Sequence, residues 1–200
     1  MKILKFGGSS VGSHVNVRRI IEIVRSKKEQ GEEVVLVCSA FNKVTDQLIN
    51  AGKLAEKKDN STYIEIFESF KERHRLAIEE LVTDSEIKNV MLEEFEDSMH
   101  RVEDILKGIN MLGELSDKTL AQLASFGERF SAFIVAGVLK NEGLNGVYVN
   151  ATKLVRTDSN YLNAKVNFEK TNKNILDYFE TMHGTAVVTG YIGSDEFGNV

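Results

Sequence analysis

The chain has 200 residues, of which 42% are hydrophobic and 28% charged, and its formal net charge is -5 at pH 7. This composition is typical of a globular domain with a real core and excludes a disordered tail. The negative charge gives no general attraction for nucleic-acid phosphates, and no apolar stretch approaches the roughly 20 residues of a membrane span, so we expect no nucleic-acid partner and no membrane partner.

The only cysteine, Cys38, follows the apolar run 34–37 and is predicted to be a core residue rather than a reactive thiol. A single cysteine excludes an intrachain disulfide framework. The apolar segment at the amino terminus is too short for a secretory signal peptide. We therefore expect a cytoplasmic protein.

The first part of the chain has the pattern of a βαβ unit. Residues 2–6 form a short apolar strand candidate, and the glycines and serines of 7–10 are expected to form a loop. A helix follows, ending near Gly31, and its apolar positions recur at helical spacing: Val17, Ile20, Ile21 and Val24. A second strand is expected over 33–38, parallel to the first and reached by a right-handed crossover.

Residues 59–112 are expected to form a helical insertion packed beside the sheet. Acidic residues outnumber basic ones here, and no strand pattern interrupts the segment. Its apolar residues recur at the spacing of two or more amphipathic helices: Ile64, Phe67, Phe70, Ile78, Leu81, Val90, Leu92 and Phe95. We interpret the acidic face as solvated rather than as a docking surface for a basic partner.

Alternating helices and strands resume after this segment. The pattern predicts a helix over 117–139, a strand over 146–150, a helix over 168–179, a buried strand over 185–189, and a hairpin turn over 194–198 that opens into another strand. The fold class is therefore α/β, a three-layer αβα sandwich with a mostly parallel sheet.

The segment after the first strand combines Lys5 with Gly7, Gly8, Ser9 and Ser10. Paired glycines let a ligand approach the backbone, whose amides can converge on a phosphate, and Lys5 would add a positive charge beside it. A simple Gly-Gly turn with an exposed lysine remains an equal alternative. The spacing matches neither the GxxxxGK[ST] loop of P-loop proteins nor the GxGxxG pattern of dinucleotide-binding folds.

Two further polar clusters are candidates. Ser39 ends the second strand and Thr45 begins the next helix, which places both at the sheet edge where ligands bind, although Thr45 could equally be a helix N-cap. In the helix over 117–139, Glu128 lies off the apolar stripe, one turn from two serines. Gly127 is costly inside a helix, and the close approach of a ligand or strand would explain it.

Six segments together resemble aspartokinases in order and approximate spacing. They are KFGGSSV at 5–11, the strand end VCSA at 37–40, VT at 44–45, SFGERFSA at 125–132, RTD at 156–158 and TGYIG at 189–193. The resemblance spans essentially the whole chain and corresponds to the amino-terminal part of an amino-acid-kinase domain. Residues 107–116 and 163–168 look more like the bifunctional aspartokinase/homoserine dehydrogenases.

The resemblance implies ATP-dependent phosphorylation of the side-chain carboxylate of L-aspartate, with Mg²⁺ as cofactor and no protein metal ligands identified. It implies that Lys5 is the catalytic lysine and that the phosphates lie against Lys5, Gly7, Gly8 and Ser9. Aspartate would contact Ser39, Thr45 and Glu128, with Glu128 holding its ammonium group. Tyr191 stands where the family often has phenylalanine and would form a wall of the site. A homo-oligomer is implied for the full-length protein.

Aspartokinases continue beyond this region into a Gly-Arg-Gly-Gly-Ser-Asp type motif, an adenine-binding half and regulatory domains. We therefore expect 1–200 to be the amino-terminal portion of such a protein, without the carboxy-terminal nucleotide-binding half, and inactive by itself. Two other hypotheses remain open. One is another amino-acid-kinase member acting on glutamate, acetylglutamate, a nucleoside monophosphate or carbamate, and the other is a noncatalytic binding or assembly module.

Overall fold

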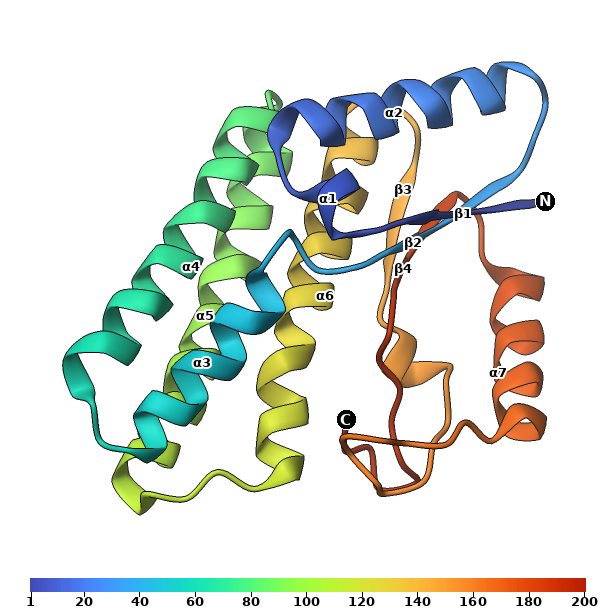
Figure 1. Cartoon of the computed structure of the whole chain (residues 1–200). Coiled ribbons are helices and arrows are strands. Elements are labelled where there is room, and N and C mark those ends of the chain that lie inside the picture. Colours follow the sequence, from blue (N-terminus) through green and yellow to red (C-terminus); the bar gives the residue numbers. More distant parts are fainter.

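The computed structural model describes all 200 residues (Figure 1). The strands are β1 (Lys2–Phe6), β2 (Val34–Cys38), β3 (Gly146–Val149) and β4 (Thr185–Thr189). The helices are α1 (Gly8–Val11), α2 (His14–Glu29), α3 (Val44–Glu56), α4 (Asn60–Leu81), α5 (Ser85–Leu112), α6 (Asp117–Asn141), a 3₁₀ turn η1 (Ala151–Lys153) and α7 (Phe168–Thr181). The expected alternation of strands and helices is thus confirmed.

The four strands form one parallel sheet in the order β1-β2-β4-β3. Lys5 lies beside Val37, and Cys38 lies between Phe6 and Thr189. Because every strand points the same way, all four end at one edge of the sheet, here called the carboxyl edge. In open α/β sheets this edge is where ligands bind.

Helices cover both faces of the sheet, which confirms the three-layer sandwich (Figure 1). Val34, Leu36 and Cys38 of β2 point into the main core on the side of α2 and α6. Val35 points to the opposite face, where it joins a small cluster that packs against α7. This alternation is the period of two of a strand buried on both faces.

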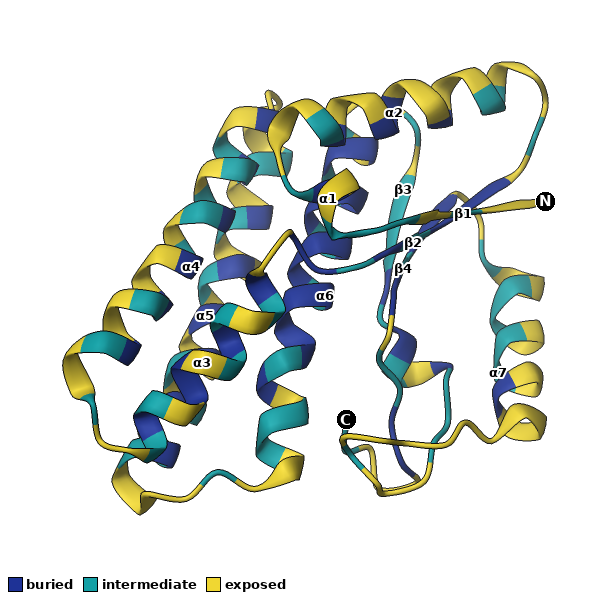
Figure 2. Cartoon of the chain, in the orientation of Figure 1, coloured by how far each residue is buried: buried dark blue, intermediate teal, exposed yellow.

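The helical segment expected over 59–112 consists of α4 and α5. They pack against α3 and α6, so that α6 stands between them and the sheet (Figure 1). Figure 2 shows α6 buried along most of its length, whereas α4 and α5 each expose one face. Five of the eight apolar residues expected to face inward are buried, namely Phe67, Phe70, Ile78, Leu81 and Phe95.

The prediction was wrong for Ile64 and Val90, which are 46% and 51% exposed. The neighbouring residues Tyr63 and Met91 occupy the inward positions instead. One residue corresponds to about 100° around a helix, so the inward stripe through Tyr63 and Met91 leaves Ile64 and Val90 on the solvent side.

The loop expected over 7–10 was also wrong in part, because Gly8–Val11 forms the short helix α1. At the other end of the chain, the strand expected at 199–200 is absent. The turn expected over 194–198 is confirmed. It forms around Asp195, whose carboxylate accepts hydrogen bonds from the amides of Phe197 and Asn199 over 3.0 and 2.8 Å. Asp195 is buried in this turn, with 1% of its surface exposed.

Candidate active site

The glycine loop, residues 7–10, begins where β1 reaches the carboxyl edge. The amides of Ser10 and Val11 donate to the Gly7 carbonyl over 2.8 and 3.2 Å, which winds the loop into α1. The amides of Gly7, Gly8 and Ser9 donate to no group of the chain. Three free amides in sequence at a helix start are a chemically suitable cradle for an anion.

Lys5 lies next to this cradle. Its side chain is exposed on the α7 face of β1, because the α7 cluster covers only the other strands. The Lys5 Nζ atom is 3.9 Å from the position that a Cβ would take on Gly7. The structure therefore brings the predicted lysine and the predicted glycine loop together.

The β2–α3 loop, residues 39–43, packs directly against the glycine loop. The amide of Ser39 donates to the Phe6 carbonyl over 3.0 Å, extending the pairing of β1 with β2. A Cβ on Gly8 would stand 3.0 Å from the Ala40 carbonyl oxygen, so only glycine permits this approach without a shift. Ser39 is consequently fixed beside the glycine loop.

Thr45 does not cap α3, which corrects that alternative. The N-cap is Lys43, in the left-handed region at a φ of 66°, and it provides no side-chain cap. Thr45 is the second residue of the helix, half-buried, with Oγ1 3.6 Å from the position of a Cβ on Gly127. Its hydroxyl therefore faces α6, near Glu128, rather than the end of its own helix.

Glu128 reaches the carboxyl edge from α6, on the opposite side of the sheet from Lys5. It is 6% exposed, and its Oε1 accepts one hydrogen bond, from the Ala40 amide over 3.3 Å. It forms no ion pair with any basic residue of the chain. Burial raises the pKa of the Glu128 carboxyl, because the charged form loses hydration that one amide does not replace.

The serines one turn from Glu128 are both buried. Ser125 donates to the Gln122 carbonyl over 2.7 Å, within its own helix, and the Ser131 hydroxyl has no partner. Gly127 is explained by close approach, since a Cβ there would lie 2.9 Å from the Ala40 Cβ and 3.2 Å from Val44 Cγ1. The approaching segment is the chain's own β2–α3 loop.

Tyr191 lies just beyond the end of β4, at the carboxyl edge. It follows Gly190, whose amide donates to the Cys38 carbonyl over 2.8 Å at the end of β4. The Tyr191 side chain is 96% exposed and its φ is 59°. Its role as a wall of the site stays a prediction.

Other candidate chemistries have less support. Cys38 is a buried core residue, as predicted, and burial raises the pKa of its thiol to about 12. No cluster of three or more His, Cys, Asp or Glu side chains could hold a metal ion. No helix is long and apolar enough to cross a membrane.

Two residues of α4 that the sequence analysis missed also contact these loops. Arg73 donates to the carbonyls of Gly12 and Asn42, and His74 stacks on Phe41. One signal was available: His74 falls on the apolar stripe between Phe70 and Ile78, where a buried polar ring needs a specific reason.

The comparisons with known proteins agree with this geometry. The chain matches the amino acid kinase family over residues 1–200, and it belongs to that family. Aspartokinase 1, chloroplastic, of Arabidopsis thaliana is 33% identical in an alignment of 199 positions, which covers 96% of this chain and 33% of that protein. The bifunctional aspartokinase/homoserine dehydrogenase 1, chloroplastic, of the same plant is 26% identical over 95% of this chain and 21% of its own length.

The same fold occurs in a solved structure, aspartokinase III of E. coli in complex with lysine and aspartate. The TM-score is 0.87 at 22% identity, covering 98% of this chain and 42% of that one. At this identity the likeness establishes the fold alone. The chain spans about a third of the length of aspartokinase 1, its curated relative at 33% identity.

Proposed function

We propose that this chain carries the aspartate-binding residues and part of the phosphate-binding site of an ATP-dependent aspartate kinase. The observation that carries this proposal is the buried carboxylate of Glu128, which has no cationic partner within the chain. A buried carboxylate is costly unless a cation pairs with it. The ammonium group of an amino acid supplies that cation.

Ser39 and Thr45 complete the recognition of aspartate. Both lie at the carboxyl edge with Glu128. Ser39 precedes Ala40, whose amide donates a hydrogen bond to Glu128, and Thr45 lies against Gly127. Hydroxyls bind carboxylates as donors, so these two would orient the substrate while Glu128 holds the ammonium. The arrangement fits a small zwitterion with a second carboxylate directed toward the glycine loop.

The glycine loop and Lys5 fit the phosphates of ATP. The free amides of Gly7, Gly8 and Ser9 would bind phosphate oxygens, and the Lys5 ammonium would neutralise the charge of the group in transfer. A side-chain carboxylate oxygen of aspartate attacks the γ-phosphorus, the bond to the bridging oxygen breaks, and 4-phospho-L-aspartate and ADP form. The chain offers no metal-ligating cluster, so Mg²⁺ would enter with the ATP phosphates.

Ligand-induced stabilisation tests the substrate assignment. L-Aspartate should raise the melting temperature of the chain, whereas N-acetyl-L-aspartate should not, because it lacks the ammonium that Glu128 would bind. L-Glutamate, acetylglutamate, carbamate and a nucleoside monophosphate are tested in the same way, because they are the substrates of the other family members considered above. Equal stabilisation by aspartate and its N-acetyl derivative would contradict the role of Glu128, and no response to any ligand would favour a noncatalytic module.

Turnover is tested on the complete gene product, by aspartate-dependent release of ADP with saturating ATP and magnesium. The proposal includes a cytoplasmic location and a homo-oligomeric assembly, although the Arabidopsis relatives are named as chloroplastic. Cell fractionation and light scattering test these two points separately.

A further inference from the structure

Arg73 of α4 joins two loops that are distant from it in the sequence. Its Nη1 donates to the Asn42 carbonyl over 2.9 Å and its Nη2 to the Gly12 carbonyl over 3.1 Å. Gly12 ends the helix α1 that grows out of the glycine loop, and Asn42 belongs to the β2–α3 loop. One planar guanidinium thus connects the backbone at the end of α1, directly after the glycine loop, to the backbone of the β2–α3 loop.

Arg73 has no acidic partner, so an ion pair does not account for its position. It is half-buried, and its guanidinium lies 5.7 Å from the centre of the Phe41 ring. The ring of His74 also stacks on Phe41, parallel within 8° at a centroid distance of 4.9 Å. Cation–π and stacking contacts fix the guanidinium in the plane that reaches both carbonyls.

His74 supports this arrangement from inside the core. It is completely buried, its Nδ1 lies 2.8 Å from the Phe70 carbonyl, and its Nε2 has no partner. Burial lowers the pKa of His74 to about 4, so the ring is neutral at pH 7 and donates from Nδ1. Phe41 therefore contacts both a neutral stacked ring and a cation.

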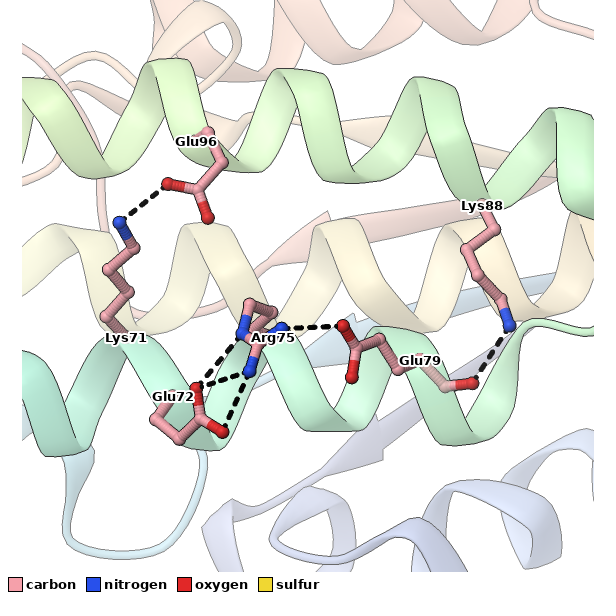
Figure 3. Close-up of polar contacts among 6 residues, drawn as sticks. All are labelled: Lys71, Glu72, Arg75, Glu79, Lys88 and Glu96. Atoms are coloured by element: carbon pink, nitrogen blue, oxygen red, sulfur yellow. Dashed lines mark hydrogen bonds and ion pairs between the residues drawn. The ribbon is translucent and has the colours of Figure 1, made fainter.

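Arg75, one position beyond His74, shows what an ordinary arginine of this helix does. Its guanidinium bonds only to Glu72 and Glu79 of the same helix (Figure 3). The neighbouring residue Lys71 likewise forms a surface ion pair, with Glu96 of α5 over 2.7 Å. Arg75 and Arg73 thus differ in one respect that matters here, namely contact with the two loops.

We propose that Arg73 is a positioning residue that sets the separation of the glycine loop from the β2–α3 loop, an inference that rests on the proposed function. The first loop would hold the phosphoryl donor and the second the aspartate that accepts the group. Arg73 touches neither substrate in this arrangement. It acts through the carbonyls of Gly12 and Asn42, and α4 thereby becomes part of the catalytic framework.

The test compares Arg73→Ala and Arg73→Lys with the control Arg75→Ala in the complete gene product. A displacement of about 1 Å between reacting groups can cost on the order of 100-fold in rate, so Arg73→Ala should lower kcat by about tenfold to 100-fold with little change in either KM. Arg73→Lys keeps the charge but loses the planar fork, and its kcat should stay near that of Arg73→Ala. Arg75→Ala should keep the wild-type kcat.

Amide hydrogen exchange supplies the second readout. In both Arg73 variants exchange should accelerate in residues 7–13 and 39–43 and stay unchanged in β3, whereas Arg75→Ala should change neither loop. A kcat near wild type for Arg73→Ala, full rescue by lysine, or exchange that accelerates uniformly would overturn the proposal. If Arg73→Ala does not fold, the decision rests on Arg73→Lys. If the unsubstituted protein shows no aspartate kinase activity, the proposed function fails, while exchange confined to the two loops still decides whether Arg73 holds them.

Discussion

The backbone amide of Ala40 donates to Glu128 over 3.3 Å, and this is the only hydrogen bond that the buried carboxylate accepts from another residue. The bond links α6 to the loop that follows β2, at the carboxyl edge of the sheet. It also leaves the second carboxylate oxygen available. The site is therefore arranged around a charge that the protein alone does not neutralise.

Replacing Glu128 by glutamine should separate ligand binding from stability. Glu128→Gln keeps an acceptor for the Ala40 amide but removes the charge, so aspartate affinity should weaken by about 2–5 kcal/mol. Calorimetric titration with L-aspartate measures this. The melting temperature without ligand should stay equal or rise, because an unpaired buried charge is no longer present. A strongly lowered melting temperature with unchanged affinity would mean that Glu128 is purely structural.

The raised pKa of Glu128 gives a definite pH dependence. Protons bind more tightly to the folded state than to the unfolded one, so the stabilisation from this group is complete below the ordinary pKa of 4.5 and is lost as pH rises through the folded value. The unliganded wild type should therefore lose stability relative to Glu128→Gln as pH rises from 4.5 through the pKa of Glu128 in the folded protein. Aspartate affinity should rise over the same interval, since the ionised carboxylate binds the ammonium. If the stabilities of the wild type and Glu128→Gln changed equally with pH, the raised pKa of Glu128 would be refuted.

Gly127 should tolerate no larger residue. Gly127→Ala would bring a Cβ to 2.9 Å from the Ala40 Cβ, and overpacking of this kind costs about 1–3 kcal/mol. Gly108→Ala in α5 is the matched control, because nothing lies within 4 Å of its Cβ position. Alanine there should stabilise the helix by up to about 1 kcal/mol. Urea unfolding of both variants measures the difference, and equal effects would contradict the close approach.

Lys5→Ala should lower turnover of the complete gene product by orders of magnitude with a smaller effect on aspartate binding, because in the proposed function the ammonium acts on charge that develops during transfer. Lys2→Ala is the control at the opposite end of β1, where the side chain pairs with Glu32 at the surface. Initial-rate kinetics at varied aspartate and ATP give both constants. Turnover close to wild type for Lys5→Ala would remove it from the catalytic assignment.

Asp195 should contribute to stability above acid pH. Hydrogen bonds, those of Asn199 first, lower its pKa to about 2 from an ordinary 3.8, so its stabilisation is complete above 3.8 and is lost as pH falls toward 2. Asp195→Asn places amide hydrogens against donors and should lower the stability at neutral pH. Acid unfolding followed by circular dichroism should be shallower in the variant. An unchanged acid transition would show that the turn does not depend on this carboxylate.

Regular periodicity made most of the fold predictable. The helix stripe of Val17, Ile20, Ile21 and Val24 is buried as expected, and β2 and β4 are apolar on both faces because helices cover both. Interpretation failed where local propensity competed with tertiary contacts. Gly7 and Gly8 suggested a loop, but the Ser10 and Val11 amides bond to the Gly7 carbonyl and close the segment into α1.

The candidate site was predictable where sequence order follows strand ends, and less so where it depends on side-chain geometry. Thr45 had the right residue type for an N-cap, yet the N-cap of α3 is Lys43, in the left-handed conformation and two residues earlier in the chain. Arg73 could not be assigned, because its partners are backbone carbonyls whose identity leaves no trace in sequence. The spacing of apolar residues predicts which residues are buried, but it does not predict which two loops lie close enough for one side chain to bridge them.

The position of β4 between β2 and β3 has a consequence for how the chain folds. It is the latest of the four strands in sequence, yet it occupies an interior place and pairs on both sides. Until it docks, two strands made earlier keep unsatisfied backbone groups along the sides that will flank it. Helices α3 to α6 can associate through contacts closer in sequence, so the bundle should consolidate before the sheet. The slot left for β4 is then the region most exposed to mispairing with another nascent chain.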